Sequence, residues 1–200
     1  MVKSDVFKLK GDDDSVNIAS VLSEVERTAQ YAKLSDKQAM HLRFLAEELI
    51  GLQKGLLGFS VGEMYVENEG KKFKLCLHAD VHLDEWDKER MIEASSTKKN
   101  DAYKGIKGKI LLAIDAMLAD PGAMSETLPI GMYECAATSH MGGLGYEQAW
   151  MLSNYRDGLD EQDTENWDML EQSVLSSLAD DIAVAARNNY VDIVIVKSFE

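Results

Sequence analysis

Hydrophobic and polar positions alternate with the period of a strand at Phe7–Leu9 and take up the period of a helix soon afterwards. The first helical stripe consists of Ile18, Val21, Leu22, Val25, Ala29 and Ala32. Ser35 and Gln38 then have the spacing of a capping box, which predicts the start of a second helix. Its apolar stripe consists of Ala39, Leu42, Leu45, Ala46, Leu49 and Leu56. We expect this second helix to fray near Gly55–Gly58.

Two strands are predicted next, at Val61–Glu67 and Lys72–Ala79, around a turn at Asn68–Lys71. One face of the second strand would carry Phe73, Leu75, Leu77 and Ala79, and the other Lys72, Lys74, Cys76 and His78. This alternation is typical of an antiparallel strand with one buried face. Asp84–Ile92 is predicted to form a short helix, and the polar stretch Ser95–Tyr103 a loop.

A third apolar stripe predicts a helix after Gly108, ended by Asp120-Pro121-Gly122. It consists of Ile110, Leu111, Ile114, Met117 and Leu118. The following stretch, 120–165, has weak periodicity and is interpreted as a helical insertion, with Tyr146–Tyr155 helical.

The last part of the chain allows two interpretations. In the first, Trp167–Leu178 is a helix, and Ile182–Ala186 and Val191–Val196 form a hairpin around two asparagines, which tolerate the positive φ of tight turns. In the second, one long helix runs over Trp167–Asn188. The β-branched run Val191–Val196 favours the hairpin. With helices between the strands, the pattern predicts an α/β fold, a two-layer sandwich in which helices cover one face of a mostly antiparallel sheet.

Composition narrows the classes of partner. The net charge of −14 argues against binding to nucleic acid or to an anionic membrane surface, since both attract basic proteins. The sequence has no apolar run long enough for a membrane span and no signal-peptide pattern at its start. Cys76 and Cys135 lack the spacing of a metal site, although a single disulfide between them stays open. We expect a cytoplasmic protein.

Three features of the middle of the chain are candidates for a binding site for an anionic ligand. The second helix carries the adjacent acids Glu47 and Glu48, and Asp80 stands at a strand end. Gly105, Lys107 and Gly108 lie where a helix begins, and the free backbone N–H groups of a helix start favour phosphate. Each feature also has an ordinary explanation, as a solvated helix face, a turn cap and a plain loop. Neither a Walker sequence, a Rossmann fingerprint nor paired metal-ligand spacing occurs.

In this order, the features resemble those of the histidine-kinase-like ATPase superfamily, called GHKL, and most closely its anti-sigma-factor-like branch. The resemblance covers roughly residues 5–118 and the final hairpin. It implies one domain over 1–200, with an ATPase-like core at 1–119 and 166–200 and the insertion at 120–165. It also implies that Glu47, or alternatively Glu48, acts as a general base, that Asp80 accepts a hydrogen bond from adenine, and that Gly105, Lys107 and Gly108 surround phosphate.

The sequence departs from the family pattern at three positions. The family has an asparagine four residues after the glutamate, which helps to hold Mg²⁺; Gly51 follows Glu47 at that distance, and Leu52 follows Glu48. The family also has glycines two and four residues after the aspartate, where this chain has His82 and Asp84. The lost asparagine argues against Mg²⁺, and the lost glycines against close approach of a nucleotide.

Two functional hypotheses follow from the resemblance and its departures. In the first, the chain binds ATP or another adenine nucleotide and has a regulatory role, with ATPase or protein serine kinase activity left open. In the second, the nucleotide site is degenerate, and the chain regulates a protein partner through its scaffold alone.

Overall fold

The computed structural model describes residues 2–9, 15–56, 61–80, 106, 108–110, 113–114, 117, 149–159, 173–187 and 190–200. The elements before the middle of the chain are β1 (Val2–Lys3), β2 (Phe7–Leu9), α1 (Ser15–Tyr31), α2 (Asp36–Leu56), β3 (Gly62–Glu69) and β4 (Lys72–Asp80). Those after it are β5 (Trp150–Met151), α5 (Leu152–Asp157), α7 (Val174–Leu178), β6 (Asp181–Arg187) and β7 (Tyr190–Ser198).

The described strands form one seven-stranded sheet in the order β1-β3-β4-β7-β6-β5, with β2 also paired to β3. Every pairing between them is antiparallel. A tight connection joins β3 to β4, and Gly70 within it has a φ of +60°, which suits glycine. The pairing of β4 with β7 brings two distant hairpins together in the centre of the sheet.

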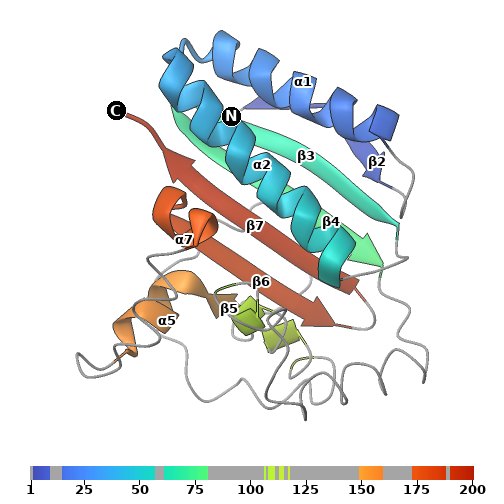
Figure 1. Cartoon of the computed structure of the whole chain (residues 1–200), viewed down its shortest axis with the longest axis vertical. Coiled ribbons are helices and arrows are strands. Elements are labelled where there is room, and N and C mark those ends of the chain that lie inside the picture. Colours follow the sequence, from blue (N-terminus) through green and yellow to red (C-terminus); the bar gives the residue numbers. More distant parts are fainter. Residues whose placement is uncertain are drawn as a thin grey trace.

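Helices α1 and α2 lie side by side across one face of this sheet (Figure 1), which we call the helix face. The capping box predicted before α2 is confirmed. The backbone N–H of Ser35 donates to Oε1 of Gln38 at 3.0 Å, and the N–H of Gln38 donates to Oγ of Ser35 at 3.4 Å. Because helices pack on one face of an antiparallel sheet, the predicted α/β sandwich is confirmed in its general architecture.

The main core lies between the sheet and its helices. Its fully buried members on α2 and the central strands include Leu42, Leu45, Leu49, Leu52, Met64, Phe73, Leu75, Leu77, Ile193 and Ile195. The buried residues Ile106, Ile110, Ala113, Ile114 and Met117 belong to the same core. The described members of the apolar stripes predicted for α1, α2 and the helix after Gly108 therefore belong to this core.

The opposite side of the sheet, which we call the second face, carries the residues that alternate with the main core. A small apolar cluster of Tyr65, Cys76, Ala149, Ala185 and Val194 is buried there. Polar side chains lie on the same face, among them His78 and Asp192, which are paired across β4 and β7. The two faces therefore differ in chemistry as well as in size.

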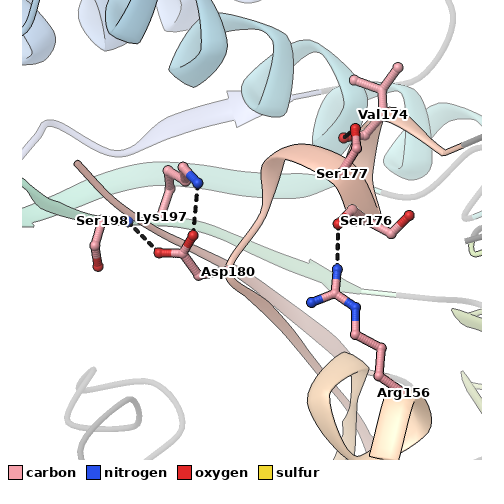
Figure 2. A network of polar contacts seen from close by, with 7 residues as sticks. All are labelled: Arg156, Val174, Ser176, Ser177, Asp180, Lys197 and Ser198. Atoms are coloured by element: carbon pink, nitrogen blue, oxygen red, sulfur yellow. Dashed lines mark hydrogen bonds and ion pairs between the residues drawn. The ribbon is translucent and has the colours of Figure 1, made fainter. Parts of the chain in front are cut away.

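Polar contacts join the short helices α5 and α7 and hold the residue before β6 to β7. Arg156 of α5 donates to the backbone carbonyl of Ser176 in α7 (Figure 2). Asp180, just before β6, accepts a hydrogen bond from Nζ of Lys197 at 2.8 Å and another from the backbone N–H of Ser198 at 2.7 Å. These contacts join α5 to α7, and the start of β6 to the end of β7.

The hairpin prediction for the last part of the chain is confirmed, because Ile182 pairs with Ile195 and Val184 with Ile193 in adjacent antiparallel strands. The alternative of one helix over Trp167–Asn188 is wrong for the same reason. The prediction of a helix over Tyr146–Tyr155 is wrong at Trp150–Met151. These two residues pair with β6 as strand β5, and helix α5 begins only at Leu152.

Several predictions lie outside the described residues. They are residues 57–58 of the fraying segment Gly55–Gly58, the helix Asp84–Ile92, the loop Ser95–Tyr103, most of the 120–165 insertion and the helix from Trp167 up to residue 172. Of the insertion, the structure describes residues 149–159, which supply β5 and α5 rather than helix alone. None of the described helices is long and apolar enough to cross a membrane.

Candidate functional site

Glu47 lies on α2 and is held in an ion-paired network that joins the two helices. Nε of Arg43 donates to Oε1 of Glu47 at 2.9 Å, and Nη1 of Arg43 contacts Glu26 of α1. The hydrogen bonds that Arg43 donates to Glu47 and to Glu26 raise the pKa of Arg43 above its already high ordinary value. Glu47 is thus a partly exposed acid with a guanidinium partner, not a carboxylate that faces the sheet.

Gly51 lies one helical turn after Glu47 on α2. It is exposed, and a methyl group added there would meet no atom within 4 Å. The next residue, Leu52, is only 1 % exposed and faces the core. Because residues four apart lie one turn above each other, Glu47 and Gly51 share an outward-facing side of α2. Glu48, the alternative acid, is also only partly buried.

Asp80 is the last residue of β4. Its backbone N–H donates to the carbonyl of Val61 at 3.1 Å, and its Cα partner across the sheet is Tyr190. Side chains alternate between the two faces of a strand, so Asp80 shares the second face with His78 rather than the helix face with Ala79. The structure therefore does not bring Asp80 and Glu47 to the same side of the sheet.

A histidine–aspartate pair lies directly beside Asp80. Nδ1 of His78 and Oδ1 of Asp192 are 2.7 Å apart, and their side chains are 25 % and 7 % exposed. The His78 ring stacks on Tyr190 with centroids 5.2 Å apart and an interplanar angle of 13°. The Asp192 hydrogen bond raises the pKa of His78 above its usual value, and burial opposes this rise. The negative charges of Asp192, Glu63 and Asp80 add to it.

The glycine turn predicted before the third helix is described only in part. Ile106, Gly108, Lys109 and Ile110 are helical, so the helix has begun by Ile106 and includes Gly108. Gly108 is buried, and Nζ of Lys109 lies 5.5 Å from the ring centroid of Tyr155. Gly105 and Lys107 lie outside the described residues. The prediction that these residues surround phosphate stays a prediction.

Sequence reasoning missed the His78–Asp192 pair. In the sequence, His78 is one polar residue on a face of the strand Lys72–Ala79, and Asp192 lies within the predicted strand Val191–Val196. One signal was available, because Asp192 is the single charged residue within the apolar run Val191–Val196. Its partner could not be read from the sequence, since the two residues are 114 positions apart.

The part of the chain that the structure describes contains no group of three or more His, Cys, Asp or Glu residues placed to hold a metal ion. The pair at His78 is a hydrogen-bonded contact between β4 and β7. Compared with models of protein families, with curated proteins and with solved structures, the chain matches none of them.

Proposed function

We propose that the chain is a regulatory domain that binds an adenine nucleotide and does not depend on hydrolysis for its role. The observation that carries the proposal is the position of the helix that contains Gly108. Its described apolar residues, Ile106, Ile110, Ala113, Ile114 and Met117, are buried in the same core as residues of α2 and β4. In the histidine-kinase-like ATPases that the sequence resembles, these three elements surround the nucleotide.

The start of this helix supplies the physical basis for phosphate binding. Backbone N–H groups in a first helical turn lack partners within the helix, and the helix dipole favours negative charge there. Gly105 would allow the backbone to approach phosphate closely, and Lys107 would add positive charge in a protein of net charge −14. The adenine would lie across the end of β4, where the Asp80 carboxylate would accept a hydrogen bond from its amine.

Two features of α2 support a role without hydrolysis. A general base must be free to accept a proton from water, whereas Glu47 is held by Arg43 on a side of α2 that faces solvent. The position that holds Mg²⁺ in the family is Gly51, which has no side chain to coordinate a metal.

Isothermal titration of the full chain with ATP, with and without Mg²⁺, tests this proposal. We expect binding that is largely independent of Mg²⁺. We also expect Asp80→Asn to weaken it about tenfold, because the amide presents a neutral acceptor in place of a charged one. Glu69→Gln is the control, since Glu69 lies at the opposite end of the same hairpin. The absence of heat and of a thermal shift at millimolar nucleotide would exclude the proposal, and binding unaffected by Asp80→Asn would refute the role of Asp80.

The second candidate is a scaffold that regulates a protein partner without nucleotide. Two observations favour it. Asp80 lies on the second face of the sheet and not on the helix face with the proposed phosphate site. Two apolar side chains on α2, Met40 and Phe44, are 49 % and 42 % exposed. They are four residues apart and therefore neighbours on one side of the helix. If nucleotide fails to bind, Met40→Asp and Phe44→Asp should abolish capture of the partner while leaving the unfolding transition unchanged.

A further inference from the structure

The pair formed by His78 and Asp192 joins the two central strands of the sheet near one end. It connects β4 to β7 at directly opposite positions, two residues before β4 ends at Asp80 and two residues after β7 begins at Tyr190. The stacked Tyr190 ring covers one side of the imidazole. Backbone pairing beyond the pair is short, so the side-chain contact closes this end of the two strands.

Every described titratable or charged group that faces this pair can be named by strand. β3 contributes Glu63, opposite His78, whose carboxylate is 3.6 Å from Nζ of Lys8 on β2. On the second face of β4 and β7, the other such residues nearest the pair are Cys76, Asp80 and Tyr190. On β6, the uncharged Ala185 is opposite Asp192. Arg187 is opposite Tyr190, and its side chain is not among those that the structure describes.

The charge balance of this cluster depends on one proton. Asp192 is 7 % exposed, and a buried carboxylate is costly unless it is paired and hydrogen-bonded. With His78 protonated, Asp192 has a cationic partner, and Glu63 and Asp80 have a positive charge nearby. Without that proton the ring is neutral, and Asp192 loses its cationic partner although His78 can still donate a hydrogen bond to it.

We propose that the His78–Asp192 pair is a proton-controlled lock that holds the Asp80–Tyr190 end of β4 and β7 together. Loss of the proton weakens the lock and loosens this end of the sheet, while the opposite end stays closed. The sign follows from linkage. Because the folded pKa of His78 lies above the usual 6.5, the stabilisation is fully present below pH 6.5 and is lost as the pH rises through the folded value. The inference does not depend on nucleotide binding.

Two NMR measurements on the full chain test the lock. The first is a titration of the assigned His78 ring resonances, which we expect to show a pKa above the ordinary value of about 6.5, and a lower one in Asp192→Asn. The second is hydrogen–deuterium exchange, expressed as protection factors to remove the intrinsic pH dependence. Between about pH 6 and pH 9 we expect several-fold lower protection at Ala79 and Val191, which are opposite each other across β4 and β7, and unchanged protection at the opposite residues Phe73 and Lys197.

His78→Gln provides the matched variant, because it keeps a polar side chain of similar size but cannot gain a proton. In this variant the pH dependence of protection at the Asp80 end should disappear. The same pH dependence in His78→Gln, or an equal loss of protection at both ends of the sheet, would overturn the inference. So would a His78 ring in the wild-type chain that titrates at or below its ordinary value, a result that requires no variant to fold.

Discussion

The two faces of the sheet differ in what they bury. The helix face buries aliphatic and aromatic side chains between two layers, and Phe73, Leu75 and Leu77 have almost no exposed surface there. The second face buries a smaller apolar cluster together with polar groups, including Asp192 and Glu67. Apolar burial stabilises a fold without specifying chemistry, whereas a buried charge must be compensated by particular partners. The comparison therefore assigns stability mainly to one face and proton chemistry to the other.

The largest expected effect tests whether the faces differ in stability. Phe73→Ala should lower the free energy of unfolding by about 3–5 kcal/mol, because it removes a fully buried ring that also meets Phe199 edge-on at 5.8 Å. Tyr65→Ala is the matched change on the second face, where Nζ of Lys3 lies 3.6 Å from the ring centroid. We expect a smaller loss for Tyr65→Ala in urea denaturation. Equal losses in the free energy of unfolding would show that the second face contributes as much to stability as the helix face does.

An intermediate effect concerns the polar pair. Asp192→Asn should cost about 1–3 kcal/mol, because it replaces the charged acceptor of a largely buried hydrogen bond. Since the pKa of His78 is raised in the folded chain, the cost should be larger at about pH 6 than at about pH 9. Denaturant titrations of both chains at several pH values provide the measurement. A cost that grows with rising pH would contradict the assigned sign.

The smallest effects come from two glycines in different surroundings. Gly51→Ala should stabilise the chain by up to about 1 kcal/mol, because the position is helical and an added methyl group meets nothing within 4 Å. Gly62→Ala should instead destabilise it, since the added carbon would lie 3.2 Å from Cδ1 of Leu77 on the helix face. The midpoints of thermal unfolding of the two variants, compared with that of the wild-type chain, test both predictions. Equal shifts in the same direction would mean that the space at the two positions was misjudged.

Most of the described fold was predictable because its signals are local. The stripes of α1 and α2, the capping box of Ser35 and Gln38, and the alternation along β4 each involve residues within a few positions of one another. The prediction failed at Trp150–Met151, where pairing with β6 outweighs helical spacing. A two-residue strand has too short a pattern to be recognised from sequence.

The candidate site was less predictable than the fold. Spacing along α2 correctly puts Glu47 and Gly51 on one side of the helix, but it does not say which side faces the sheet. That side is decided by the buried leucines that pack against β4 and by the contact of Arg43 with Glu26 of α1. For Asp80, alternation along β4 already indicates the face it shares with His78, and the register with β7 shows what lies beside it.

The sequence by itself determined where most strands and helices lie and which side of each is apolar, because periodicity and turn chemistry act over a few residues. Only the tertiary structure decided that β4 pairs with β7, that residues 150–151 form the strand β5, and that His78 faces Asp192 across 114 positions. Such pairings depend on the register of strands that are distant in the chain. Register is set by the packing of the whole sheet, and no local pattern contains it.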